Sequence, residues 1–128
     1  MKKLKRSECA VLPLVLKGKW YDMIERGEKW EEYRDSTYYW GIRLVNWDDD
    51  GRECVVEFRR GYGRDAPRMA FTSPAYIHFC HSRNPEWGEP SGPHYAIFLD
   101  ERVELVEDGG GRRNGRGKTR RDGSEVKG

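Results

Sequence analysis

The densest group of chemically useful side chains lies just after Gly27. Lys29, Glu32 and Arg34 place an ammonium, a carboxylate and a guanidinium within a span of six residues. If this segment forms a strand, its side chains alternate between two faces, so Glu32 and Arg34 share one face. Together the three groups offer hydrogen-bond donors and acceptors to a base edge or a sugar. The same residues also fit a solvated, ion-paired strand edge that binds no ligand.

Apolar spacing predicts the helix that positions this group. Trp20, Met23 and Ile24 have the i, i+3, i+4 spacing of one helical face. A glycine in the left-handed conformation commonly ends a helix, and Gly27 stands where such a residue is needed. We therefore predict a helix over 18–26, with the charged group immediately beyond its end.

The rest of the body has a mostly β pattern. Cys54, Val56 and Phe58 alternate with Val55, which predicts a half-buried strand with Val55 on its outer face. Ser36 is the predicted N-cap of a short second helix. Further elements are predicted as a helix around 37–44 and strands over 11–16, 29–34, 68–72, 75–81, 94–99 and 102–106. The predicted fold class is α+β and mostly β, and short strands with two helices favour a small barrel.

The segment from Gly27 to Arg34 resembles the G-x-K-x-x-E-x-R signature of the ASCH domain, a family of small PUA-like β-barrels. Other segments follow in the order expected of bacterial and phage-type members of that family. They are Leu12-Pro13-Leu14, Trp20-Tyr21-Asp22-Met23-Ile24, Tyr39-Trp40, Arg43-Leu44, Gly61-Tyr62-Gly63, Pro67-Arg68-Met69, Asn84-Pro85-Glu86-Trp87-Gly88 and Tyr95-Ala96-Ile97. The resemblance spans about residues 11–106 and implies a small PUA-like β-barrel with one or two short helices.

The resemblance also implies a function, because ASCH and PUA-like domains are associated with recognition of RNA or nucleotides. The expected partner is RNA, a nucleotide or a modified nucleoside, bound in a cleft beside the signature residues. Carried onto this chain, Lys29 would contact a phosphate or base carbonyl, and Glu32 would accept a hydrogen bond from an exocyclic amine. Arg34 would hold Glu32 or the ligand, whereas Tyr33 is expected to face the core.

Enzymatic activity is the alternative. Some ASCH-like proteins hydrolyse the acetyl amide of acetylcytidine with a lysine, a threonine three residues later and a more distant glutamate. Lys29 matches this pattern, but Glu32 stands at the threonine position and Thr37 lies too far along the chain. A hydrolase of this type would therefore use Lys29 and Glu32 to activate water directly. Ribonuclease activity is also attributed to ASCH-like proteins, and Arg34 would then add an oxyanion stabiliser.

Two aromatic residues are candidate ligand contacts. Tyr62 and Trp87 both stand beside glycines, in predicted loops where the backbone passes close to a bound group. A planar base would stack on either ring. Most of the other aromatic residues are expected in the core, because a domain of this size needs their buried area.

Length and charge divide the chain into three parts. We predict a basic N-terminal extension over 1–10, a single domain over 11–106 and a disordered tail over 107–128. The tail has seven glycines and Val126 as its one apolar residue, so little can offset the entropy of ordering it. It carries a net charge of +3 and residues 1–6 carry +4, which leaves −5 on residues 7–106.

An acidic body argues against a broad basic face that grips a nucleic-acid backbone. The basic termini are compatible either with loose attraction to a polyanion or with a purely solubilising role. A third interpretation treats the acidic body as a protein-interaction surface, although this charge is ordinary for a soluble domain.

Cysteines and histidines give little sign of a disulfide, metal or cofactor. Three cysteines without a C-x-x-C spacing argue against a disulfide framework and for a reducing, cytoplasmic location. His78 and Cys80 supply two zinc ligands on one strand face, with His81 and His94 nearby in sequence, but Cys80 fits better as a small core residue. Asp48-Asp49-Asp50-Gly51 lacks the twelve-residue ligand spacing of a calcium loop. We expect no metal, no cofactor and no membrane segment.

Overall fold

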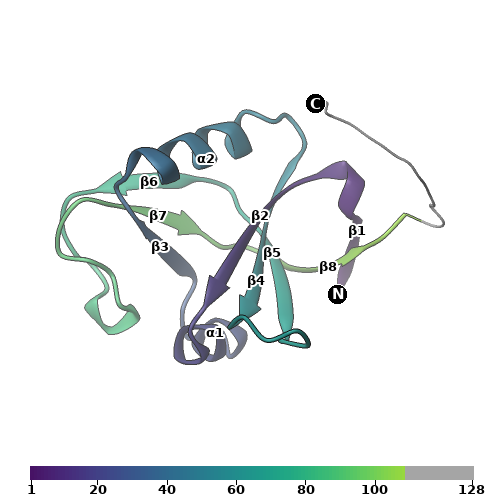
Figure 1. Cartoon of the computed structure of the whole chain (residues 1–128), viewed down its shortest axis with the longest axis horizontal. Coiled ribbons are helices and arrows are strands. Elements are labelled where there is room, and N and C mark those ends of the chain that lie inside the picture. Colours follow the sequence, from purple (N-terminus) through teal and green to yellow (C-terminus); the bar gives the residue numbers. More distant parts are fainter. Residues whose placement is uncertain (109–128) are drawn as a thin grey trace.

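A computed structural model describes residues 1–108, which form two β-sheets and two α-helices (Figure 1). The five-stranded sheet has the order β1-β8-β5-β4-β2, with strands β1 (Lys2–Lys5), β8 (Arg102–Val106), β5 (Arg68–Thr72), β4 (Glu53–Arg60) and β2 (Cys9–Leu16). The three-stranded sheet has the order β3-β7-β6, with strands β3 (Glu31–Asp35), β7 (His94–Phe98) and β6 (Tyr76–Phe79). Two 3₁₀ turns, η1 (Arg6–Glu8) and η2 (Pro85–Trp87), lie in the connections. The predicted mostly β composition is confirmed.

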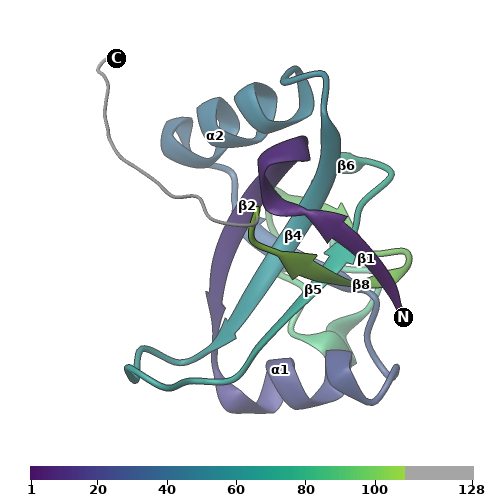
Figure 2. The same ribbon diagram turned by 90° about the vertical axis from the view of Figure 1, so that its right-hand side faces the viewer.

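The helices α1 (Gly18–Glu25) and α2 (Tyr38–Asp48) lie at opposite ends of the sheets (Figures 1 and 2). Gly27 has a φ of +79°, so the predicted left-handed end of the first helix is confirmed. The predicted Ser36 cap is wrong: Thr37 is the N-cap of α2, and its hydroxyl accepts a hydrogen bond from the Trp40 amide. The helix also continues to Asp48, beyond the predicted end. No helix within residues 1–108 has the length and apolar character needed to cross a membrane.

The strand β4 is buried on both faces over part of its length. Val56 and Phe58 enter the main core, as predicted, together with residues of β2 and both helices. Val55 was predicted on an outer face but is fully buried, because Cys9, Ala70 and neighbouring residues form a second apolar cluster over it. The N-terminal strand, which sequence analysis did not predict, packs beside this cluster.

Residues 1–10, predicted to be a basic extension, therefore contribute to the sheet. Strand β1 pairs in parallel with β8, with Leu4 opposite Leu105, and the ribbons of β1 and β8 lie side by side in both views (Figures 1 and 2). Arg6 then pairs with Glu57 at 2.7 Å and with Glu107 at 2.8 Å. Of the predicted tail over 107–128, residues 109–128 lie outside the described part of the chain.

The expected closed barrel is not found, because the two sheets do not join between β2 and β3 within residues 1–108. Strand β2 pairs with β4 only and β3 pairs with β7 only, so both are edge strands. Pro13 has no N–H to donate at this edge of β2. The Arg34 side chain donates to the Val15 carbonyl at 3.2 Å and occupies the acceptor that a neighbouring strand would use. The structure is thus an open pair of sheets.

Candidate functional site

The gap between the two edge strands contains a cavity of about 650 Å³. Its wall consists of Pro13, Leu14, Val15, Leu16, Lys17, Trp20, Glu32, Tyr33, Arg34, Asp35, Tyr39, Trp40, Arg43, Tyr62, Trp87, Gly88 and Pro90. Strands β2 and β3 supply two sides, α2 supplies a third, and loop residues complete the wall. Pockets that bind small molecules have volumes of about 300–1,000 Å³. The absence of barrel closure therefore produces a space large enough for a ligand.

Secondary structure holds the wall in place. The Trp47 indole donates to the Ala10 carbonyl at 2.8 Å and fixes α2 against β2. The Arg34 guanidinium donates to the carbonyls of Val15 and Tyr33, and it therefore connects β3 to β2 across the gap. The Arg34 side chain also lies 5.2 Å from the centre of the Trp40 ring. These contacts fix the width of the cavity without a continuous β-ladder.

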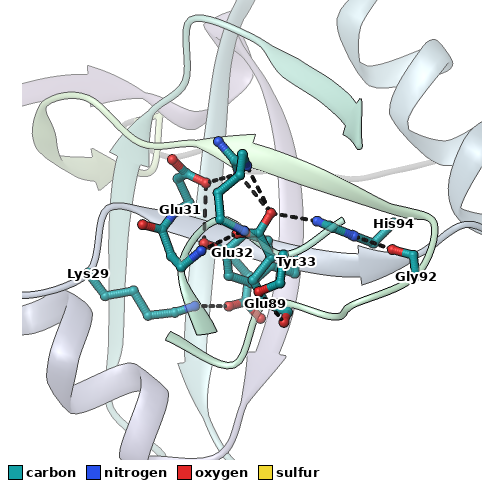
Figure 3. Close-up of polar contacts among 10 residues, drawn as sticks. Lys29, Glu31, Glu32, Tyr33, Glu89, Gly92 and His94 are labelled. Atoms are coloured by element: carbon teal, nitrogen blue, oxygen red, sulfur yellow. Dashed lines mark hydrogen bonds and ion pairs between the residues drawn. The ribbon is translucent and has the colours of Figure 1, made fainter. Parts of the chain in front are cut away.

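Lys29, Glu32 and Arg34 form one hydrogen-bonded chain, here named the cavity network (Figure 3 shows its Lys29–Glu32 contact). Lys29 Nζ donates to Glu32 Oε1 at 2.7 Å, and Arg34 Nη1 donates to Glu32 Oε2 at 2.6 Å. A carboxylate has about four lone-pair positions, so each oxygen of Glu32 retains capacity for another donor. Glu32 and Arg34 both line the cavity, as the alternation of a strand predicts.

Lys29 lies behind this wall rather than on it. Its side chain is 1% exposed, and its ammonium lies 4.7 Å from the centre of the Tyr33 ring and 5.3 Å from that of Trp20. Burial lowers the pKa of Lys29, although the charge and hydrogen bond of Glu32 oppose that effect. Lys29 does not line the cavity and contacts its wall through Glu32, and its contact with a ligand stays a prediction.

The predicted aromatic contacts are both on the wall but differ in environment. Tyr62 is 84% exposed, whereas Trp87 is buried and packs edge-on against Trp30, with the ring centres 4.5 Å apart. Tyr33 is buried with Trp87 and Ala96, as predicted, and it also reaches the cavity. Sequence analysis missed Tyr39 and Trp40 of α2 as wall residues; their place in the resemblance segments was the available signal.

The wall has more basic than acidic side chains. Lys17, Arg34 and Arg43 are basic, whereas Glu32 and Asp35 are acidic, and the Lys29 ammonium lies just behind. Residues 7–106 as a whole carry a net charge of −5. The cavity is therefore locally more positive than the body around it, which favours a ligand with a negative or strongly electron-rich group.

A second charged cluster, here named the sealed network, contains Glu31, Arg83, Glu89 and His94 (Figure 3). Arg83 Nη2 bridges Glu31 at 2.6 Å and Glu89 at 2.8 Å. Glu89 also accepts from the backbone amides of Arg83 and Asn84, both at 2.8 Å. Because these partners lie up to 52 residues apart, no local sequence pattern predicts the cluster.

His94 is fully buried. Figure 3 shows its ring between Glu89 and Gly92. Nδ1 lies 2.6 Å from the Gly92 carbonyl and Nε2 lies 2.6 Å from Glu89 Oε2. Both ring nitrogens of His94 therefore lie within hydrogen-bond distance of an oxygen acceptor. Burial alone raises the pKa of Glu89, but hydrogen bonds from His94, Arg83 and Asn84 lower it to about 2. Burial and the nearby Glu31 raise the pKa of Tyr33.

The histidines and cysteines considered as metal ligands lie in separate environments. The His78 ring shares a hydrogen bond of 2.8 Å with the Ser36 hydroxyl, whereas His94 belongs to the sealed network. Cys80 is exposed, so its predicted place in the core is wrong; β6 ends at Phe79, and the chain turns outward there. Among residues 1–108, no group of three or more His, Cys, Asp or Glu side chains is arranged to hold a metal ion.

The cavity wall is chemically suited to holding a polar, planar group. It combines five aromatic or cationic side chains on α2 and β3 with the carboxylates of Glu32 and Asp35, and Glu32 can accept further hydrogen bonds. Within the described residues, no serine, threonine or cysteine lines it, and the Thr37 hydroxyl is engaged as the cap of α2. A hydroxyl or thiol nucleophile of those types is therefore not presented to the cavity.

Comparison of the chain with models of protein families, with curated proteins and with solved structures finds no match.

Proposed function

We propose that this protein is an ASCH-type, PUA-like module that binds an RNA base, a nucleotide or a modified nucleoside in the cavity between β2 and β3. The observation that carries the proposal is the pairing of Glu32 with Arg34 on the wall of a cavity of about 650 Å³. The cavity lies between the edge strands of the two sheets, where a ligand can enter without separating a β-ladder. The sequence resemblance over residues 11–106 supports the same assignment.

Each part of a nucleotide has a matching group on the wall. The free lone pairs of Glu32 accept hydrogen bonds from an exocyclic amine, as acidic side chains do with cytosine. Tyr62, Trp87 and Trp40 offer aromatic surface for the base. The basic excess of the wall attracts the phosphate of a nucleotide.

The buried Lys29 serves this site by holding the Glu32 side chain in one orientation. A carboxylate that accepts from an ammonium on one oxygen and a guanidinium on the other has a fixed plane. The remaining lone pairs then point in fixed directions, which favours one arrangement of donors on the ligand. Discrimination among bases would follow from this geometry.

An amide NMR titration tests the proposal. The isotopically labelled protein is titrated with each ribonucleoside, with acetylcytidine and with short RNA, and shifts are expected at Glu32, Arg34, Trp40 and Trp87. Glu32→Gln removes the carboxylate and is expected to weaken binding of the best ligand about tenfold. Glu28→Gln is the matched control, because Glu28 is exposed and pairs with Arg26 outside the cavity. Absence of shifts around the cavity with every ligand contradicts the proposal.

Hydrolysis of acetylcytidine or RNA is the second candidate function, and it rests on the buried Lys29 beside Glu32. A lysine whose pKa is lowered by burial loses its proton at a lower pH than an exposed one, so more of it is available as a general base near neutral pH. The position of Lys29 behind the wall and the lack of a serine or threonine on the described wall make this candidate weaker. Free acetate or RNA fragments that form with the wild-type protein and not with Lys29→Ala would establish an enzyme and overturn the receptor proposal.

A further inference from the structure

A second cavity of about 310 Å³ continues along the same edge of β2. Its wall consists of Ala10, Val11, Leu12, Pro13, Arg43, Asn46, Trp47, Asp50 and Arg52. Pro13 and Arg43 also line the larger cavity, so the two spaces adjoin at these residues. The two walls together follow β2 from Ala10 to Lys17, which is a length of roughly 23 Å at the usual rise of a strand.

Arg43 stands at the junction without a counter-ion among residues 1–108. Its guanidinium lies 5.3 Å from the centre of the Tyr39 ring and 5.4 Å from that of Trp40. Its Nε is buried and has no hydrogen-bond partner among these residues. A guanidinium that stacks on aromatic rings and has no carboxylate partner within residues 1–108 is a suitable phosphate-binding group.

The other arginines along this edge are already neutralised. Arg34 pairs with Glu32 at 2.6 Å in the larger cavity, and Arg52 pairs with Asp50 at 2.6 Å in the smaller one. Arg43 is therefore the strongest anchor for an anion at the point where one cavity passes into the next. A negative group on Arg43 would lie where the two cavities meet, and a base beside Glu32 would lie in the larger cavity.

We propose that the two cavities form one groove for single-stranded RNA, with a base beside Glu32 and the phosphate of the next nucleotide on Arg43. This inference rests on the proposed function, and it extends the ligand from a single nucleoside to an oligonucleotide. The body charge of −5 disfavours a duplex, which would need a broad basic surface. A groove with several aromatic rings and the cations Lys17 and Arg43, neither of which forms an ion pair within residues 1–108, suits a single strand.

An extended peptide is a poor occupant of the same groove. Peptides that add to a sheet edge bind through the backbone groups of that edge. On the free edge of β2 the Val15 carbonyl already accepts from Arg34, and Pro13 has no N–H. The edge therefore lacks the regular donors and acceptors that an added strand requires.

The test compares nucleosides with oligonucleotides. Affinities of the full-length protein are measured by calorimetry for the four ribonucleosides and for the tetranucleotides rA4, rC4, rG4 and rU4, at several salt concentrations. The best tetranucleotide is expected to bind at least tenfold more tightly than its nucleoside. Arg43→Gln is expected to remove about tenfold of tetranucleotide affinity and to reduce the salt slope by about 0.7. Nucleoside affinity should fall much less, because a nucleoside has no phosphate for the guanidinium, although Arg43 also lines the larger cavity.

Two further variants make the result specific. Arg43→Lys keeps the charge and loses the planar stack, so it is expected to retain most of the salt slope. Arg68→Gln is the matched control, because Arg68 is exposed on β5 outside both cavities and its loss should change neither affinity. Thermal unfolding of each variant confirms that it is folded.

The outcomes separate this inference from the proposed function. Nucleoside binding that involves Glu32, with no gain for tetranucleotides or no effect of Arg43→Gln, overturns the groove and leaves the proposed function intact. Binding of neither nucleosides nor tetranucleotides overturns both. A gain for tetranucleotides that Arg43→Gln removes and Arg68→Gln does not supports the groove.

Discussion

The cavity network and the sealed network both include residues of β3, but they differ in how many hydrogen-bond positions of their carboxylates are already occupied. In the sealed network, Glu89 is fully buried and accepts hydrogen bonds from His94, from the Arg83 side chain and from two backbone amides. In the cavity network, Glu32 accepts from only two donors, and both Glu32 and Arg34 line the cavity. Saturated and sealed charges stabilise a structure, whereas charges with spare capacity beside a cavity are available to a ligand.

The sealed network also positions part of the cavity. Glu89 accepts from the amides of Arg83 and Asn84 at the start of the loop that carries Trp87. Arg83 ties this loop to Glu31 of β3 at 2.6 Å. One charged cluster therefore fixes a wall of the site, and the other is expected to contact the ligand.

Removal of Glu89 is expected to have the largest effect, and it tests whether the sealed network stabilises the fold. Glu89→Ala leaves His94, Arg83 and two backbone amides without their acceptor in a buried place, so we expect a loss of about 3–5 kcal/mol in the free energy of unfolding. Urea unfolding followed by circular dichroism measures it. Glu86→Ala, an exposed neighbour, is the matched control and should change little. A loss in unfolding free energy below about 1 kcal/mol for Glu89→Ala would show that the sealed network contributes little to the stability of the fold.

Acid titration probes the same network without mutation. Because the folded-state pKa of Glu89 is lowered from 4.5 to about 2, its stabilising effect is complete above pH 4.5 and is lost as the pH falls toward 2. The shift corresponds to about 3 kcal/mol. Urea midpoints measured between pH 6 and pH 2 should fall over this interval. Glu89→Gln should flatten that part of the curve; an unchanged slope in the variant would assign the acid sensitivity to other carboxylates.

Lys29→Met gives the corresponding test of the cavity network. Methionine fills the space of the buried side chain, and Glu32 keeps Arg34 as a partner at 2.6 Å. We therefore expect a smaller loss in unfolding free energy, about 1–2 kcal/mol, by the same urea method. Lys19→Met, which removes an exposed ammonium 4.6 Å from the Trp20 ring, is the control. A loss for Lys29→Met equal to that of Glu89→Ala would mean that both networks are primarily structural.

Local patterns predicted most elements of the fold. The alternation around Val56 and the spacing of Trp20, Met23 and Ile24 depend on neighbours in sequence, and β4 and α1 form where these patterns place them. The end of the second helix was predicted wrongly because it depends on a contact between residues that are distant in sequence. The second helix runs past its predicted end because Trp47 is bonded to Ala10, a residue 37 positions away.

The site was predicted only in part, because some of its contacts also join residues that are distant in sequence. Glu32 and Arg34 share a face through strand alternation, and both are on the cavity wall. The barrel prediction failed because closure depends on whether β2 and β3 pair, and Arg34 occupies the carbonyl of Val15 instead. Arg83 joins Glu31 from 52 residues away, a contact that only the folded chain reveals.

Tyr62 offers the finest test of the difference between structural and ligand-facing residues. It lines the cavity yet is 84% exposed, so Tyr62→Ala should change the free energy of unfolding by less than about 0.5 kcal/mol. If its ring stacks on a base, nucleoside affinity should fall roughly fivefold to tenfold, which calorimetry measures. Tyr38→Ala is the matched control, because Tyr38 is 86% exposed on α2 and does not line the cavity. Equal affinities for the two variants would place the stacking surface on the buried Trp87 or on Trp40, and the ligand would then contact residues that also support the fold.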